Sequence, residues 1–145
     1  MKNTYTSNSR DETEKLGEEF AKSLSPGDVV CLYGELGAGK TVFVKGLMKG
    51  IGIEERVTSP TFTLIHEYNV NHNSIKKIYH IDLYRLENIE RVKNIGILEL
   101  FNENNAVVVI EWAEKMGDLL PKKRVDLFLK QLEEDKREIQ ILSLG

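Results

Sequence analysis

The residues best suited to chemistry form a glycine-rich segment in the first third of the chain. It reads Gly34-Glu35-Leu36-Gly37-Ala38-Gly39-Lys40-Thr41. The segment matches the phosphate-binding pattern G-x-x-x-x-G-K-[ST] at every position. Glycines let the backbone take positive φ angles and approach phosphate oxygens closely, so that successive N–H groups form an anion nest. We expect Lys40 to reach the β- and γ-phosphates of a nucleotide and Thr41 to place its hydroxyl on Mg²⁺.

A strand and a helix on either side of this loop are predicted by hydrophobic patterning. Val29–Tyr33 is a short apolar run that follows the breaker Ser25–Asp28, which is typical of a buried strand. A helix is predicted from Thr41 to about Gly50, with apolar residues on its inner side. This strand, loop and helix are the context that a P-loop NTPase requires. The alternative is a glycine turn that binds nothing.

Two acidic residues at the ends of apolar runs are candidates for a metal site. Glu111 ends the aliphatic run Ala106–Ile110, and Asp82 follows Ile81 in a second run. Mg²⁺ usually takes one or two carboxylates and keeps several waters. Because a buried strand-end carboxylate is costly without a partner, a metal is one good partner for each. A carboxylate that simply faces solvent is the alternative for both residues.

Other marked residues allow more than one interpretation. Thr58–Phe62 is either a switch loop that touches the γ-phosphate or a proline turn. His80 lies two residues before Asp82 and therefore on the same strand face, where it either transfers protons or packs in the core. Three further side chains are candidates for the site or a partner, or are ordinary surface or core residues: Tyr84, Arg85 and Trp112.

The remaining patterns predict an α/β protein with a P-loop NTPase-like three-layer α/β/α architecture, in which a mixed sheet carries an antiparallel hairpin insertion. A single domain over residues 1–145 is expected from the length. Ser9 and Glu12 form a capping box that starts the first helix. Further strands are expected at 2–6, 62–70, 75–83, 106–111, 125–132 and 137–142, and further helices at 87–101, interrupted near Gly96, and 113–120.

Composition narrows the function classes. The chain has 145 residues, 41% of them hydrophobic, with a net charge of −3 and one cysteine. No apolar run approaches the length of a membrane span, no secretory signal is recognisable, and a lone cysteine fits a reducing cytosol. The mixed charge gives no reason to expect tight nucleic-acid binding by this chain alone. We therefore expect a cytoplasmic protein with little chain to spare for a second substrate.

The order of four motifs resembles a known family. GELGAGKT at 34–41, TSPTF at 58–62, HIDLYRL at 80–86 and EWAE at 111–114 occur together within one short chain. This combination is similar to the bacterial TsaE family, the ATPases of tRNA threonylcarbamoyladenosine biosynthesis. The resemblance covers nearly the whole chain and is more specific than the phosphate loop alone.

The resemblance implies binding of ATP and Mg²⁺, with slow hydrolysis by the protein alone. It implies two partners, TsaB and TsaD, of which TsaD transfers the threonylcarbamoyl group to the adenosine beside the anticodon of ANN-decoding tRNAs. Contact of this chain with tRNA would be indirect or weak. By the same resemblance Lys40 binds phosphates, Thr41 and Glu111 hold Mg²⁺, and Asp82 supports the metal or the attacking water. Thr61 would sense the γ-phosphate.

Three other functions remain open at this point. A small-molecule P-loop kinase would phosphorylate a metabolite without a protein partner. A GTP switch would normally carry N-K-x-D and D-x-x-G, and neither string occurs in the sequence. A scaffold stabilised by a nucleotide would need binding but no hydrolysis.

Overall fold

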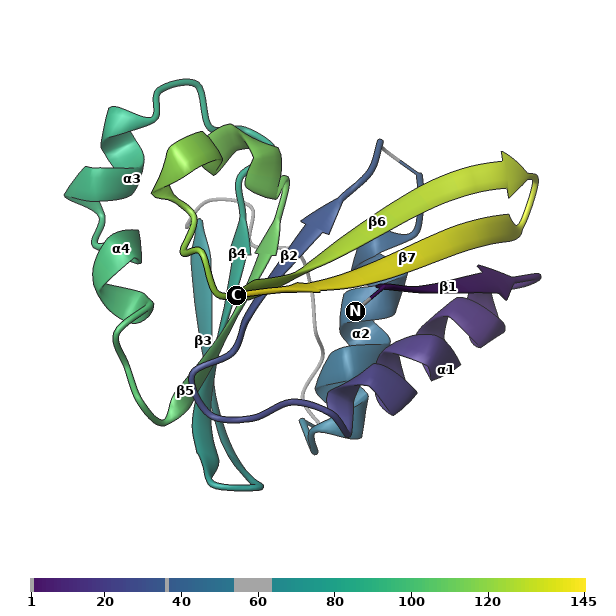
Figure 1. Ribbon diagram of the computed structural model, residues 1–145, viewed down its shortest axis with the longest axis horizontal. Coiled ribbons are helices and arrows are strands. Elements are labelled where there is room, and N and C mark those ends of the chain that lie inside the picture. The colour runs from purple at the N-terminus through teal and green to yellow at the C-terminus, as the bar shows by residue number, and fades with distance from the viewer. Residues whose placement is uncertain (1, 36, 54–63) are drawn as a thin grey trace.

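The computed structural model describes residues 2–35, 37–53 and 64–145, which form a seven-stranded sheet with helices on both faces (Figure 1). The strands are β1 (Lys2–Ser7), β2 (Val29–Tyr33), β3 (Ile65–His72), β4 (Ile75–Asp82), β5 (Ala106–Glu111), β6 (Arg124–Glu133) and β7 (Lys136–Leu144). The helices are α1 (Arg10–Ala21), α2 (Lys40–Gly50), α3 (Glu90–Asn94), α4 (Ile97–Leu100) and the 3₁₀ helix η1 (Ala113–Leu119). The expected mixed sheet and three-layer architecture are confirmed.

The sheet order is β1-β7-β6-β2-β5-β4-β3. Strands β6, β2, β5 and β4 are parallel to one another. Strand β1 runs in the same direction, because β1 and β6 both pair antiparallel with β7. Five strands therefore end at one edge of the sheet, and the residues that follow them meet there. In open α/β sheets this carboxyl edge is where ligands bind.

Two hydrophobic clusters hold the layers together. Helices α1 and α2 cover one face of the sheet, and α3, α4 and η1 cover the other (Figure 1). Along β2, β4 and β5, side chains on opposite faces of the pleated strand belong to different clusters. The first cluster includes Val30, Leu32, Phe43, Leu47, Leu127 and Ile139. The second includes Cys31, Ile81, Val92, Ile97, Ile110 and Met116.

Glycines bring the backbones of α1 and α2 into direct contact. A Cβ atom on Gly46 would lie 1.9 Å from the carbonyl oxygen of Glu14, and one on Gly17 would lie 2.2 Å from that of Phe43. Only glycine fits at these two positions, since the obstructing atoms belong to helix backbone. The contact fixes α2, which begins at the phosphate loop, against α1.

The structure differs from the sequence-based expectations mainly at element ends. The hairpin turn of β3 and β4 is shorter than expected, because only Asn73 and Ser74 leave the strands, and both take positive φ angles (48° and 69°). The interruption expected near Gly96 is confirmed: Gly96 has a φ of 82° and separates α3 from α4, but the helices begin only at Glu90 and are short. Residues 62 and 63 of the expected strand lie outside the described residues. No helix in the described part of the chain is long and apolar enough to cross a membrane.

Candidate functional site

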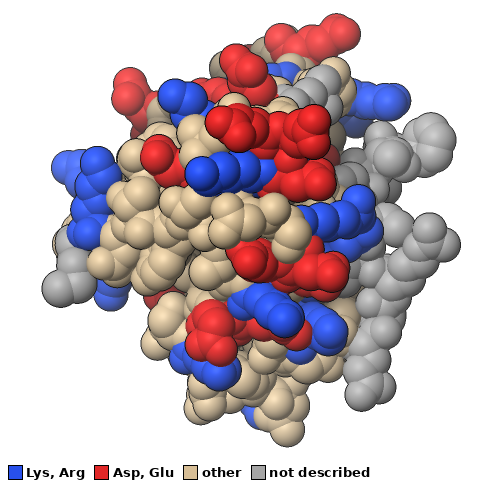
Figure 2. All heavy atoms as spheres, turned by 90° about the vertical axis from the view of Figure 1, so that its right-hand side faces the viewer, with Lys and Arg blue, Asp and Glu red and all other residues tan. Residues whose placement is uncertain are grey.

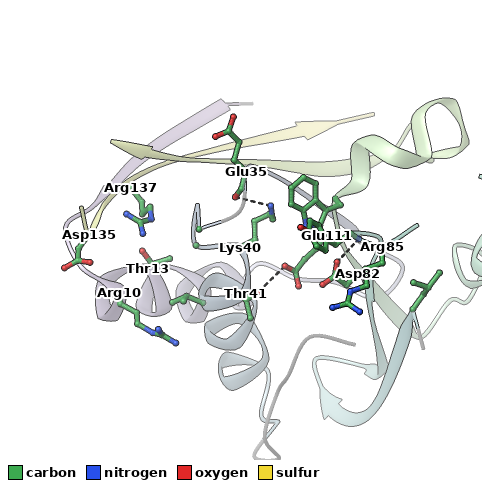
Figure 3. Close-up of a pocket in the computed structure, with 16 residues that line it drawn as sticks. Arg10, Thr13, Glu35, Lys40, Thr41, Asp82, Arg85, Glu111, Asp135 and Arg137 are labelled. Carbon is green, nitrogen blue, oxygen red and sulfur yellow. Dashed lines mark hydrogen bonds between the residues drawn. The ribbon is translucent and has the colours of Figure 1, made fainter. Parts of the chain in front are cut away.

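A pocket of about 600 Å³ lies at the carboxyl edge of the sheet (Figure 3). It is lined from six places in the chain: the first turn of α1, the loop from β2 into α2, Leu64 before β3, the end of β4 and the residues after it, the end of β5 with Trp112, and the turn from β6 into β7. Five of these segments follow or end one of the five strands that run to this edge. Leu64 reaches the same edge because β3 runs antiparallel to β4 and therefore starts there.

The predicted phosphate loop forms the floor of this pocket. Gly34, Gly37 and Gly39 have φ angles of 151°, 82° and 99°, which favour glycine. A Cβ atom on Gly34 would lie 2.6 Å from the carbonyl oxygen of Leu129 on β6, so a side chain there would push the loop off the sheet. Gly39 caps α2 and provides no side-chain hydrogen bond to the first turn. The helix N-terminus is therefore suited to an anion.

Lys40 lies in the middle of the pocket, only 6% exposed. Its Nζ donates to the carbonyl oxygens of Gly34 and Glu35, the latter at 3.3 Å, and it lies 3.7 Å from the ring centroid of Trp112. Burial lowers the pKa of Lys40, and the carboxylate of Glu111 opposes that shift. The ammonium is thus partly desolvated, which strengthens its attraction for a phosphate.

Trp112 is placed over Lys40 by an unusual backbone conformation. It follows β5 directly and has a φ of 60° and a ψ of 41°, a left-handed conformation that is uncommon for a bulky residue. Its ring lies 5.2 Å from that of Tyr84, and Lys115 donates to the carbonyl oxygens of Tyr84 and Leu86. The residues after β4 and β5 therefore form one connected wall, with Trp112 facing the phosphate loop.

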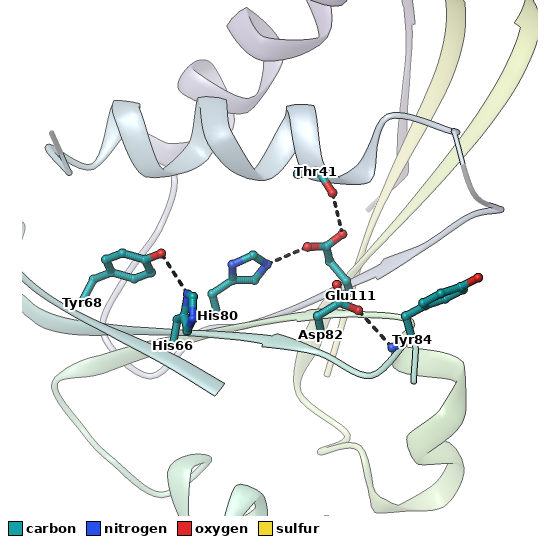
Figure 4. A network of polar contacts seen from close by, with 7 residues as sticks. All are labelled: Thr41, His66, Tyr68, His80, Asp82, Tyr84 and Glu111. Atoms are coloured by element: carbon teal, nitrogen blue, oxygen red, sulfur yellow. Dashed lines mark hydrogen bonds and ion pairs between the residues drawn. The ribbon is translucent and has the colours of Figure 1, made fainter. Parts of the chain in front are cut away.

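Glu111 is the most buried carboxylate of the site, at 2% exposed. Its Oε1 accepts a hydrogen bond from Oγ1 of Thr41 at 3.3 Å, and its Oε2 lies 2.6 Å from Nε2 of His80 (Figure 4). The first contact joins the end of β5 to the start of α2. A hydroxyl and a carboxylate therefore meet beside the phosphate loop, as a magnesium site needs.

Asp82 lies next to Glu111 because the two residues are paired in the parallel register of β4 and β5. Its Oδ1 accepts a hydrogen bond from the backbone N–H of Tyr84 at 3.0 Å (Figure 4). Burial raises the pKa of Asp82, the N–H of Tyr84 counters that shift, and the neighbouring Glu111 carboxylate adds to it. Two carboxylates held this close favour a cation between or beside them.

The far end of the pocket contains residues that sequence reasoning missed. Arg10 and Thr13 come from α1, and Asp135 and Arg137 come from the turn after β6 and the start of β7 (Figure 3). The Oγ1 atom of Thr13 lies 2.7 Å from the Oγ atom of buried Ser7, which ties α1 to β1. The one sequence signal nearby was the capping box, in which Ser9 accepts a hydrogen bond from the N–H of Glu12.

Most of the predicted site residues meet in this pocket. Those that line it are Gly37, Gly39, Glu35, Lys40, Thr41, Asp82 and Glu111, joined by Tyr84, Arg85 and Trp112. Gly34 lies behind them as an acceptor for Lys40, and Ala38 is buried in the core. Leu36, Thr61 and the segment 58–62 lie outside the described residues.

The donor atoms suit Mg²⁺, a hard cation that prefers oxygen ligands. No group of three or more His, Cys, Asp or Glu side chains in the described ranges is arranged to hold a metal by itself. A magnesium ion in a P-loop site does not need one, because a hydroxyl, nucleotide phosphates and water complete its shell. The site residues Thr41, Glu111 and Asp82 therefore fit this group.

Comparison with known proteins agrees with the motifs. The family model described as "Threonylcarbamoyl adenosine biosynthesis protein TsaE" matches residues 7–139. A tRNA threonylcarbamoyladenosine biosynthesis protein TsaE from Bacillus subtilis is 39% identical over 135 residues, 93% of this chain and 82% of the relative. The TsaE protein of Treponema pallidum is 42% identical over 135 residues, 93% of this chain and 96% of the relative.

A solved structure supports the same assignment. The crystal structure of YdiB from Bacillus subtilis has a TM-score of 0.80 and 33% identity to this chain, and the match covers 100% of this chain and 87% of the other. Similarity in sequence and in fold thus extends over the whole pocket-forming part of the molecule. The chain belongs to the TsaE family, whose members take part in the biosynthesis of threonylcarbamoyladenosine in tRNA.

Proposed function

We propose that this chain binds ATP with Mg²⁺ and hydrolyses it to ADP and phosphate, slowly on its own, as the ATPase subunit of tRNA threonylcarbamoylation. The observation that carries the proposal is the contact between Thr41, at the start of α2, and Glu111, at the end of β5. It brings a hydroxyl and a carboxylate together directly beside a complete phosphate loop. That combination is suited to a metal-bound nucleotide.

In this proposal the pocket residues have three tasks: some hold the phosphates, some hold the metal, and some hold the ribose and base. The loop 34–41 and Lys40 hold the phosphates, and Mg²⁺ when bound neutralises charge that develops on them during transfer. Thr41 and Glu111 hold the metal, and Asp82 orients its water or the attacking water. Thr61, which lies outside the described residues, is assigned the task of sensing the γ-phosphate. Thr13 and the side chains of Arg10, Asp135 and Arg137, at the far end of the pocket, hold the ribose and base.

The proposed partners are TsaB- and TsaD-type proteins, with tRNA held mainly by them. Acidic and basic side chains are intermixed on the side that carries the tip of the β6–β7 hairpin, with no continuous basic patch on that face (Figure 2). The net charge of −3 likewise supports tRNA binding mainly by the partner proteins. A subunit that needs only a nucleotide site and a docking surface can be as small as this chain.

The proposal is tested by ATP turnover, measured as phosphate release with and without the purified TsaB–TsaD complex. We expect slow turnover alone and a clear increase with the complex. Lys40→Ala should abolish both, whereas Lys49→Ala, on the exposed far end of the same helix, should not. Unchanged turnover on adding the complex would contradict the partner role. Phosphate transfer to a metabolite without any protein partner would favour a small-molecule kinase instead.

A further inference from the structure

His80 is a completely buried histidine that the proposed function does not use. It is 0% exposed and lies on the α2 side of the sheet, on the same face of β4 as Ile78. The one hydrogen bond of its side chain among the described residues joins Nε2 to Oε2 of Glu111 at 2.6 Å, and Nδ1 has no partner there. We propose that His80 is a positioning residue that fixes the Glu111 carboxylate for metal binding.

The direction of this hydrogen bond follows from the two groups. An ionised carboxylate has no hydrogen to give, so Nε2 donates and Oε2 accepts. At 2.6 Å the contact is at the short end of charge-assisted hydrogen bonds. Donation from Nε2 leaves Nδ1 as a bare acceptor in an apolar layer, which costs free energy. An aliphatic residue would fill that layer without the cost, so the contact to Glu111 is what distinguishes histidine here.

The geometry separates the two oxygens of Glu111. His80 holds Oε2 from the β4 side, whereas Oε1 faces Thr41 at the start of α2 (Figure 4). Thr41 is a pocket residue and His80 is not. A metal that binds between Thr41 and Oε1 would therefore leave the His80 contact in place. Side chains that hydrogen-bond to a ligating carboxylate orient it, and their loss typically costs 10–100-fold in metal affinity.

The inference rests on the proposed function, because it assigns His80 the role of positioning a ligand of the proposed magnesium ion. The test compares His80→Gln, whose amide nitrogen reaches about as far as Nε2, with His80→Asn, which is polar but one methylene shorter. Affinity for ADP is measured by calorimetry in EDTA and over a series of Mg²⁺ concentrations. We expect wild type and His80→Gln to reach half of the Mg²⁺-dependent gain in ADP affinity at similar Mg²⁺ concentrations. His80→Asn should need a concentration about 10–100-fold higher. Affinity in EDTA should be the same for all three.

A second comparison separates positioning from general packing. In a protein that already carries Glu111→Gln, adding His80→Asn should not raise the required Mg²⁺ concentration further, because His80 acts on the metal only through the Glu111 carboxylate. If His80→Asn lowers the affinity for ADP by the same factor in EDTA as in the presence of Mg²⁺, the role of His80 is merely structural and the proposal is overturned. Should His80→Asn fail to fold, His80→Met, which fills the space without a donor, replaces it with the same expectation.

The outcomes for the metal site and for His80 can be told apart. If the ADP affinity of the wild-type protein does not change with Mg²⁺ concentration, the metal site itself is refuted, and this inference with it. A wild type that responds to Mg²⁺, together with a His80→Asn variant that responds at the same concentration, would refute only the role of His80.

Discussion

Replacement of Glu111 by glutamine separates the folding role of this residue from its proposed metal role. The carboxylate is buried and accepts hydrogen bonds from His80 and Thr41. A glutamine side chain can keep both contacts: its oxygen accepts from His80, and its NH₂ donates to the Thr41 oxygen, which is also an acceptor. The free energy of unfolding should therefore change by no more than about 1 kcal/mol, the typical net worth of one hydrogen bond.

Hydrolysis should respond very differently. An amide is a poor ligand for Mg²⁺ in place of an anionic oxygen, so the variant lacks one charged contact that matters in the transition state. Loss of one such contact often costs about 10²–10³ in rate. We expect Glu111→Gln to lower Mg²⁺-dependent ATP turnover by that factor, measured as phosphate release. Thr41→Ala should have a comparable effect.

Glu111→Ala is the matched comparison for stability. It leaves the buried Nε2–H of His80 without an acceptor, which costs about 1–3 kcal/mol, and it opens space beside β4. Urea denaturation should therefore rank the alanine variant clearly below the glutamine variant. A glutamine variant with wild-type turnover would show that the metal is not held at Glu111, and equal destabilisation of both variants would refute the hydrogen-bond reasoning.

Four further outcomes follow from the structure. Lys40→Ala should weaken ADP binding about 10–100-fold in calorimetry, since a charged hydrogen bond is worth about 1.5–3 kcal/mol. Asp82→Asn should stabilise the metal-free protein at neutral pH, because burial raises the pKa of Asp82 and makes its charged form unfavourable. The folded state then binds this proton more tightly than the unfolded state, so the advantage seen in thermal melts in EDTA should vanish as the pH falls toward the ordinary value of 3.8. Cys31, whose pKa burial raises to about 12, should react with a thiol reagent at pH 8 only as the protein unfolds. Gly46→Val should lower stability by at least about 1–3 kcal/mol in urea denaturation, because its Cβ would lie 1.9 Å from the carbonyl oxygen of Glu14.

The phosphate-binding end of the pocket could be predicted from sequence because its signals are local. A glycine loop between an apolar strand and a helix specifies its own conformation, and the run that ends at Glu111 identifies a buried strand. Parallel strands bring their ends to one edge, so Asp82 and Glu111 were expected near Thr41, and they line the same pocket. These inferences need no knowledge of which strands are neighbours across the rest of the sheet.

The other end of the pocket could not be predicted in this way. Arg10 and Arg137 are distant in sequence, and both line the pocket because β1 pairs with β7 and β7 with β6. Patterning located these strands but gave no register between the first and last segments of the chain. The position of Trp112 over Lys40 depends on one left-handed residue, which local propensity does not indicate for tryptophan.

The charges of the pocket argue that nucleotide and metal bind together. Among the lining residues described, four are cationic and four are anionic. Such a pocket cannot by itself offset the charge of a triphosphate, and two of its carboxylates, Asp82 and Glu111, lie beside the loop that would hold the phosphates. In the absence of a cation they oppose a phosphate. Under the proposed function, Mg²⁺ would be held by these carboxylates, and the raised pKa of Asp82 should then be reversed. Affinity for ATP should therefore rise steeply with Mg²⁺, because the ion removes a repulsion as well as adding an attraction.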